Sequence, residues 1–113
     1  MREGRFYTFW VYIMGSHSGT IYVGMTGFLS PRVGQHKSGS IEGFTKKYKC
    51  DRLLYYEIYD SVFRAKARER QLKGWRREKK IKLIEKVNPR WEDLAEHLGK
   101  EMLFRGQSLK RTP

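Results

Sequence analysis

The side chains best suited to chemistry in this 113-residue chain are two tyrosines, an arginine, a histidine and a glutamate. They are Tyr12, Tyr22, Arg32, His36 and Glu69. The carboxylate is a candidate ligand for a cation, and the hydroxyl and imidazole groups are candidates for proton transfer. The secondary-structure elements predicted around these residues decide whether they meet.

Both tyrosines lie in a predicted β-hairpin over residues 8–26, whose β-branched and aromatic strands flank the Gly/Ser-rich loop 15–19. A symmetric loop pairs Met14 with Thr20 and Tyr12 with Tyr22. Alternation of side chains then gives one aliphatic face, made of Val11, Ile13, Ile21 and Val23. The other face carries the two tyrosines side by side, and Gly24 leaves a gap opposite Trp10. A ligand could occupy that gap.

Arg32 and His36 share one face of the next predicted element, because residues four apart on a helix are neighbours. Ser30 is a suitable N-cap, followed by a proline at the first helical position. We expect this helix to end near Gly39. Gly34 weakens it by roughly 1 kcal/mol relative to alanine.

Glu69 is unusual because it falls within the apolar stripe of a predicted helix that begins at Asp60 or Ser61 and ends near residue 73. It follows Val62 by seven residues, about two helical turns. An inward carboxylate needs a cation, since burying it unpaired is costly. The sequence supports two interpretations of Glu69 equally. It forms a structural salt bridge with an arginine such as Arg32, or it is a ligand for Mg²⁺ or Mn²⁺.

The remaining elements complete a small α/β (α+β) fold. Residues 38–50 read as a loop or short helix, in which Phe44 and Tyr48 either pin the segment to the core or contact nucleic acid. Residues 52–59 are apolar on both faces and predict a central strand. A helix follows Gly74 and ends at Asn88-Pro89, with Ile81, Ile84 and Val87 facing inward. Residues 90–97 predict a last short helix.

Composition points to an intracellular protein that binds a polyanion. The net charge is +12, and residues 64–82 hold ten Lys or Arg against two acids. Charge alone would equally suit a ribosome-associated protein. The lone Cys50 and the lack of a convincing signal peptide predict a cytoplasmic location, and no apolar run reaches the roughly 20 residues that span a bilayer. The predicted nucleic-acid contacts are Thr45, Lys46, Lys47, Lys73, Arg76 and Arg77.

Taken together, these residues resemble the GIY-YIG nuclease superfamily, in particular its small single-domain bacterial members. The likeness covers about residues 6–94. The Gly-Ile-Tyr motif falls on Trp10-Val11-Tyr12, the Tyr-Ile-Gly motif on Tyr22-Val23-Gly24, the family arginine on Arg32 and the metal-binding glutamate on Glu69. The tripeptides alone are weak signals. Their spacing, the two helices and the later stretch NPRWEDL make the match specific.

The resemblance implies a three-stranded, mostly antiparallel sheet flanked by helices, and hydrolysis of phosphodiester bonds in nucleic acid, DNA by preference, in repair or recombination. Tyr12 or Tyr22 would orient or deprotonate the water, Arg32 would bind the phosphate, and Glu69 would hold Mg²⁺ or Mn²⁺. His36 is implied as a proton shuttle or a phosphate contact. The alternative is a basic DNA- or RNA-binding module that keeps the fold without catalysis.

The chain departs from the family pattern at four places, one of which is the unusual pair Pro31 and Gly34 around Arg32. Trp10 replaces the glycine of the first motif, and Met25 stands where some relatives have a lysine. The late asparagine of some relatives has no secure counterpart, since Asn88 is better interpreted as a helix cap. We expect the domain to span residues 6–94 and residues 95–113 to form a flexible basic tail. A lone small domain favours recognition of shape or ends, with a protein partner as a further source of specificity.

Overall fold

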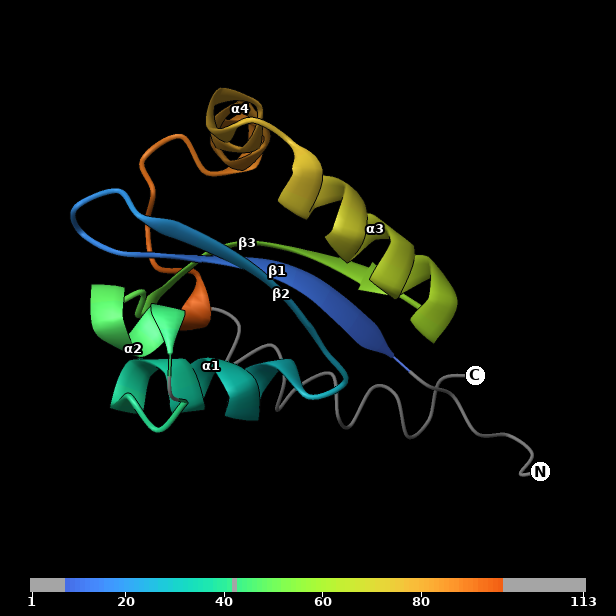
Figure 1. Ribbon diagram of the computed structural model, residues 1–113, viewed down its shortest axis with the longest axis horizontal. Helices are drawn as coiled ribbons and strands as arrows, with labels where there is room; N and C mark the ends of the chain where they lie inside the picture. Colours follow the sequence, from blue (N-terminus) through green and yellow to red (C-terminus); the bar gives the residue numbers. More distant parts are fainter. Residues whose placement is uncertain (1–7, 42, 97–113) are drawn as a thin grey trace.

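The computed structural model describes residues 8–41 and 43–96. Its centre is an antiparallel sheet in the order β2-β1-β3, formed by β1 (Phe9–Gly15), β2 (Ile21–Thr26) and β3 (Arg52–Tyr59). Helices α1 (Leu29–Ser38) and α2 (Phe44–Tyr48) lie on one side of this sheet, and α3 (Val62–Gly74) and α4 (Arg77–Val87) lie on the other (Figure 1). The predicted α+β class is confirmed. The tail predicted beyond residue 96 lies outside the described residues.

The hairpin has the predicted faces but not the predicted register. Tyr12 pairs with Gly24 and Met14 with Tyr22, a shift of two residues from the symmetric loop. The turn starts one residue later because Ser16 closes it, its N–H donating to the Thr20 carbonyl and its hydroxyl accepting from the Thr20 N–H. A slip of two residues preserves the alternation, so the aliphatic and tyrosine faces remain as expected.

The prediction that the third strand is central was wrong, because β1 occupies the middle and β3 is an edge. The apolar sequence of β3 has a different cause, since helices or the chain after α4 cover both of its faces. Leu53 packs in the cluster on the α1 side and Leu54 in the cluster on the α3 side, and both are fully buried. The Leu94 N–H donates to the Leu53 carbonyl, so a later segment seals part of this edge.

Helix α1 begins earlier than expected. Its N-cap is Phe28, which makes no side-chain cap bond, and Ser30 lies inside the first turn. Pro31 is tolerated there because the first N–H groups of a helix have no intrahelical partner. The end is as predicted, with Gly39 at φ 75° accommodating the left-handed cap.

Helices α3 and α4 follow the sequence more closely. Ser61 caps α3 by accepting from the Arg64 N–H, as predicted. In α4, Ile84 is fully buried, but Val87 is 63% exposed and does not face the core as predicted. Leu83 packs against the core in its place.

Candidate active site

The candidate site centres on Tyr12, which β1 presents toward α1. Its hydroxyl lies 2.9 Å from His36 Nε2 in a buried hydrogen bond. The second ring nitrogen, Nδ1, lies 3.0 Å from Thr45 Oγ1. Tyr12, His36 and Thr45 are 1%, 4% and 3% exposed, so β1, α1 and α2 meet in a continuous buried chain of polar groups. Thr45, predicted to contact nucleic acid, is inside the protein and its hydroxyl faces His36.

The gap expected at Gly24 does not exist, because the ring of Tyr12 fills it. A Cβ built on Gly24 would lie 2.5 Å from the Tyr12 hydroxyl oxygen, well inside van der Waals contact. Tyr12 therefore leans from the central strand across β2, and its hydroxyl lies toward the edge of the sheet. Glycine is needed at residue 24 for this close approach. The prediction that Gly24 lies opposite Trp10 was wrong, because Gly24 pairs with Tyr12.

Tyr22 stands beside this chain, half-buried, with its ring centroid 5.5 Å from His36 and 6.4 Å from Tyr12. On its outer side it stacks on Phe44, with 6.2 Å between the ring centroids, and the ring centroid of Phe44 lies 4.8 Å from that of Tyr48. Phe44 and Tyr48 are 46% and 44% exposed, so they do not pin α2 to the core. A row of aromatic rings instead leads from the buried tyrosine to the surface.

Arg32 lies one helical turn before His36 and is exposed. Within residues 8–41 and 43–96 its guanidinium has no ion-pair partner. Its charge contributes to the electrostatics of the site. The pKa of His36 is lowered to about 4, mainly by burial and secondly by the charge of Arg32. The pKa of Tyr12 is raised well above its ordinary value, mainly by burial and secondly by the neighbouring Tyr22. The charge of Arg32 opposes this rise, and the charge of Glu69 adds to it. The free protein therefore holds both groups neutral at pH 7.

Glu69 faces Lys73 and not Arg32. Its Oε2 lies 3.3 Å from Lys73 Nζ, the carboxylate side chain is 21% exposed, and the lysine is 53% exposed. An ion pair of this kind is weak and exchangeable. Glu69 lies on α3, on the face of the sheet opposite α1, and its charge contributes to the raised pKa of Tyr12 on β1.

One carboxylate suits Mg²⁺ or Mn²⁺ only if water and a substrate phosphate complete the coordination. Within the described residues no three His, Cys, Asp or Glu side chains gather into a metal cluster. Mg²⁺ commonly keeps several waters and takes one or two carboxylates, so a lone, partly exposed Glu69 fits that pattern. The donor set is therefore compatible with a hydrated cation that binds tightly only together with the phosphate.

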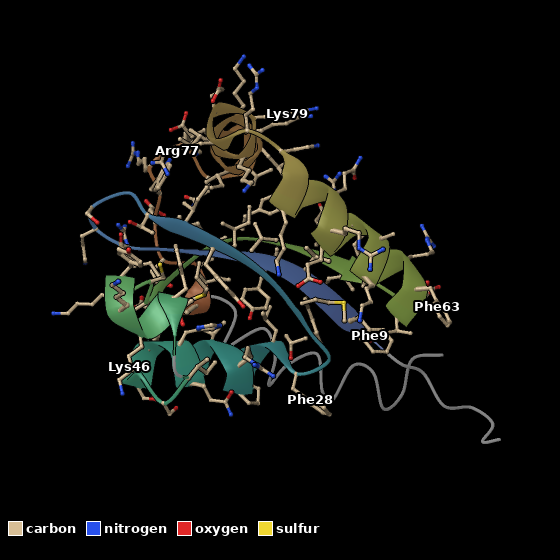
Figure 2. All side chains as sticks on the ribbon, viewed as in Figure 1. Phe9, Phe28, Lys46, Phe63, Arg77 and Lys79 are labelled. Carbon is tan, nitrogen blue, oxygen red and sulfur yellow. The ribbon has the colours of Figure 1, made fainter. Side chains whose placement is uncertain are left out.

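The predicted basic contacts fall on two sides of the sheet. Lys46 projects beside α2, whereas Arg77 projects beside α4 at the hairpin end (Figure 2). A Cβ on Gly19 would lie 3.2 Å from an Arg77 guanidinium nitrogen, so this arginine lies against the hairpin loop. Lys47, Lys73 and Arg76 are exposed. The two basic groups thus flank the same end of the sheet from opposite faces.

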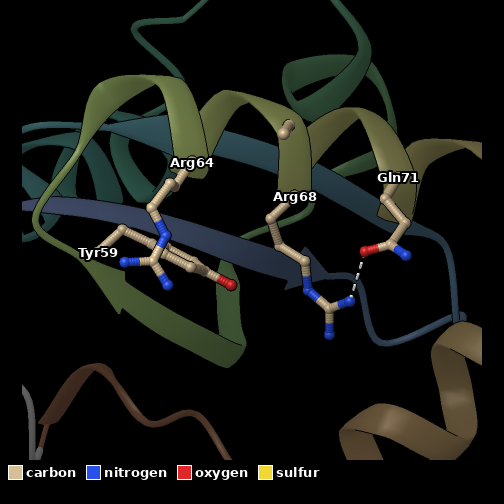
Figure 3. A pocket seen from close by; sticks show the side chains of 5 residues that line it. Tyr59, Arg64, Arg68 and Gln71 are labelled. Atoms are coloured by element: carbon tan, nitrogen blue, oxygen red, sulfur yellow. Dashed lines mark hydrogen bonds between the residues drawn. The ribbon is translucent and has the colours of Figure 1, made fainter.

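Sequence reasoning missed a second polar cluster, centred on Glu57 of β3. Its carboxylate accepts from the hydroxyls of Tyr55 and Tyr59 and from Arg68, whose Nε and Nη2 lie 2.9 Å from its two oxygens. Beside it is an open hollow of about 580 Å³ whose lining includes Tyr59, Arg64, Arg68 and Gln71 (Figure 3). The alternation of Tyr, Glu and Tyr along one strand face was the available signal. This hollow lies away from Tyr12 and His36.

Asn88 plays a structural part, in agreement with its interpretation as a helix cap. It is the C-cap of α4 and is 5% exposed. Its Nδ2 donates to the carbonyls of Leu54 and Glu92, and its Oδ1 accepts from the Glu92 N–H. These bonds tie the chain after α4 to β3.

The fold and this constellation define a class, and comparison with known proteins agrees with it. The family model described as the GIY-YIG catalytic domain matches residues 8–82, so this chain belongs to the GIY-YIG family of nucleases. It is similar to a UPF0213 protein of Staphylococcus saprophyticus, at 32% identity over 66% of this chain and 92% of the relative. A UPF0213 protein of Staphylococcus aureus is 34% identical over 66% of this chain and 90% of its own length.

A solved structure extends the comparison to the fold. The solution NMR structure of a UPF0213 protein from Bacillus halodurans matches with a TM-score of 0.51 and 27% identity, covering 76% of this chain and 92% of that chain. The resemblance stated from the sequence is thereby confirmed. Among the helices the structure describes, none has the length and apolar character needed to cross a membrane.

Proposed function

We propose that this protein is a metal-dependent endonuclease that hydrolyses phosphodiester bonds in DNA, in repair or recombination. The observation that supports this most is the buried hydrogen bond between Tyr12 and His36, one helical turn from the exposed Arg32. A phosphate binder and a proton-accepting pair then stand side by side in a chain that belongs to a nuclease family.

Arg32 binds the scissile phosphate in this proposal. Its guanidinium, which has no ion-pair partner in the part of the chain that the structure describes, presents a fixed fork of donors to two phosphate oxygens. Negative charge grows on those oxygens as water attacks, and a donor already in place stabilises it without reorganisation. Removal of one such donor typically costs about 100-fold or more in rate.

Tyr12 and His36 accept the proton of the attacking water. A phenol with a raised pKa is a poor base alone, so Tyr12 must release its own proton as it takes the new one. His36 Nε2 lies 2.9 Å away and is neutral at pH 7, since its pKa is lowered to about 4. Tyr22, half-buried beside the pair, orients the water.

Glu69 would hold the metal ion. When bound, Mg²⁺ or Mn²⁺ would polarise the phosphate and support the leaving oxygen. Lys73, which is 53% exposed, is free to move and would leave the carboxylate to the cation. Lysine would then neutralise Glu69 in the free protein, and the metal ion would do so in the complex.

Five exposed basic residues supply the contacts to the phosphate backbone, together with the exposed rings of Phe44 and Tyr48. The basic residues are Lys46, Lys47, Lys73, Arg76 and Arg77. Such contacts release counterions, so affinity for DNA falls steeply as salt rises. Exposed aromatic rings beside lysines suit stacking on unpaired bases. Binding that stays flat between low and physiological salt would show that these residues are not the contact surface.

The deciding experiment is cleavage of branched, nicked and duplex DNA, and of single-stranded RNA, with Mg²⁺ or Mn²⁺. Wild type is compared with Arg32→Ala and Glu69→Ala, and the matched controls are Arg90→Ala and Glu78→Ala, both exposed and outside the site. We expect the first two substitutions to abolish cutting and the controls to retain it. Full activity of Glu69→Ala would remove the metal-ligand assignment, and cleavage of RNA alone would overturn DNA as the substrate.

A second candidate is a nucleic-acid-binding module without catalysis. The observation that favours it is that Tyr12 is 1% exposed and Glu69 already meets Lys73, so substrate and metal must displace existing contacts. An inactive wild type that still binds DNA with steep salt dependence, under all the metal and substrate conditions above, would support this module and reject the nuclease.

A further inference from the structure

Helix α2 presents a single side chain to the interior. Of its five residues, Phe44–Tyr48, all of which are described, Thr45 is the buried one. Its hydroxyl lies 3.0 Å from His36 Nδ1, on the opposite side of the ring from Tyr12. The helix therefore holds this hydroxyl against the imidazole, and nothing in the nuclease motifs assigns a role to it.

The hydrogens available to this chain allow two arrangements. Neutral His36 carries one N–H, and Tyr12 and Thr45 carry one O–H each. In the first arrangement Nδ1–H donates to Thr45 and Tyr12 donates to Nε2. In the second, Thr45 donates to Nδ1 and Nε2–H donates to Tyr12. Either way one hydroxyl hydrogen is left pointing elsewhere.

The charge of Arg32, one helical turn before His36, favours the first arrangement. The spare hydrogen belongs to Thr45 in the first arrangement and to Tyr12 in the second, and both hydroxyls are buried, so burial does not decide between them. The Arg32 charge acts on the Tyr12 hydroxyl more strongly than Glu69 does. A nearby cation favours lone pairs, not a hydrogen, on its side, and the first arrangement turns the lone pairs of Tyr12 outward.

We propose that Thr45 is a positioning residue: its Oγ1 accepts from His36 Nδ1–H and so turns the Nε2 lone pair toward the Tyr12 hydroxyl. The catalytic consequence of this inference rests on the proposed nuclease function, whereas the hydrogen-bond arrangement of His36 does not. During hydrolysis one water proton passes to the Tyr12 oxygen while the Tyr12 proton passes to Nε2. The resulting hydroxide forms the new bond to phosphorus. The bond to the leaving sugar oxygen breaks, and that oxygen keeps the electron pair and takes a proton from solvent.

Thr45 also stabilises the product of that transfer. Once Nε2 has taken a proton, His36 is an imidazolium that donates at both nitrogens. The Thr45 oxygen accepts from Nδ1–H, and the proton on Nε2 later returns to solvent. With the opposite tautomer Nε2 already carries a hydrogen, so the ring cannot accept a proton from Tyr12.

The test is the tautomer of His36 in the free full-length protein, read from the ¹⁵N chemical shifts of its ring nitrogens near pH 7. The exposed His17 serves as an internal reference for an unrestrained imidazole. We expect wild type and Thr45→Ser to carry the proton on Nδ1, and Thr45→Val to lose that preference. An Nε2–H tautomer in wild type, or an unchanged tautomer in Thr45→Val, overturns the proposal.

Cleavage kinetics give the second readout. We expect Thr45→Val to lower kcat by about 10- to 100-fold with KM changed less than about 2-fold, and Thr45→Ser to restore kcat to within about 3-fold. A merely structural role would raise KM or lower thermal stability in both variants. If wild type cleaves no substrate, the nuclease proposal fails, and the ¹⁵N shifts still decide the tautomer.

Discussion

Two glutamates, Glu57 on the edge strand β3 and Glu69 on helix α3, differ in how completely their carboxylates are satisfied. Glu57 accepts from two tyrosines and two guanidinium nitrogens. Glu69 meets one exposed lysine at 3.3 Å. A carboxylate with four donors is a structural anchor, whereas one with a weak, mobile partner has room for another ligand. This difference supports Glu69, and not Glu57, as the acid of the proposed metal site.

The sharpest way to break this comparison is to neutralise Glu69 without changing its shape. We expect Glu69→Gln to lower the rate of DNA cleavage by at least about 100-fold, because the amide cannot replace the charge that holds the metal. The free energy of unfolding should stay within about 0.5 kcal/mol of wild type. Rates under saturating Mg²⁺ and urea unfolding measure both quantities, with Glu78→Gln as the control.

The same change at Glu57 should have the reverse profile. We expect Glu57→Gln to lower the free energy of unfolding by about 2–3 kcal/mol, because Arg68 loses its charged partner in a half-buried place. The cleavage rate at a temperature where the variant is folded should fall less than about 3-fold. If Glu57→Gln abolishes cleavage in a folded protein, the division between anchor and functional acid is wrong.

Gly24 offers a test of the close approach that brings Tyr12 to the β2 edge. We expect Gly24→Ala to cost about 1–3 kcal/mol in the free energy of unfolding, since the added methyl would overlap the Tyr12 hydroxyl. Cleavage should fall as Tyr12 moves. The matched control is Gly34→Ala, where nothing lies within 4 Å, and there we expect a gain of about 0.5–1 kcal/mol from helix propensity.

The last comparison concerns the pH dependence of stability on the Tyr12 side. The pKa of His36 is lowered to about 4 from its ordinary 6.5, so the folded protein holds it neutral. The unfolded chain takes up a proton below about pH 6.5. The contribution of His36 to stability is therefore present above pH 6.5 and is lost as the pH falls toward 4, by at most about 1.4 kcal/mol per pH unit.

Urea unfolding at about pH 7 and about pH 5 measures that loss. We expect His36→Gln to show a smaller loss of stability across this interval than wild type, and His17→Gln to match wild type because His17 is exposed. An equal pH dependence in wild type and His36→Gln would mean that other groups cause it.

Much of this arrangement could be predicted from the sequence because it depends on local periodicity. The faces of the hairpin follow from alternation, and the start of α3 follows from Ser61. Glu69 was expected within an apolar stripe, but its side chain is 21% exposed and Val62 of that stripe is 38% exposed. The register could not be predicted, because a slip of two residues leaves the alternation unchanged and only the Ser16 hydrogen bonds decide it. The edge position of β3 was hidden because both of its faces are covered.

The partners of Thr45 and Glu57 were beyond sequence reasoning for another reason. Each depends on a contact between distant segments, nine residues for Thr45 with His36 and eleven for Glu57 with Arg68. Thr45 sits between exposed aromatics and lysines, and that composition indicated a surface. Its hydroxyl points inward because α1 and β1 orient the short helix. A local sequence pattern does not contain that information.

The segment after α4 occupies backbone groups on the outer edge of β3. Asp93 Oδ1 accepts from the Leu53 N–H, the Leu94 N–H donates to the Leu53 carbonyl, and Lys37 of α1 pairs with Asp93. A chain cut at residue 82, where the family match stops, would keep every proposed catalytic residue and leave those groups of β3 unbonded. Unbonded strand groups invite pairing with another molecule. Residues 93 and 94 thus occupy groups of the edge strand that would otherwise be open to pairing with another strand.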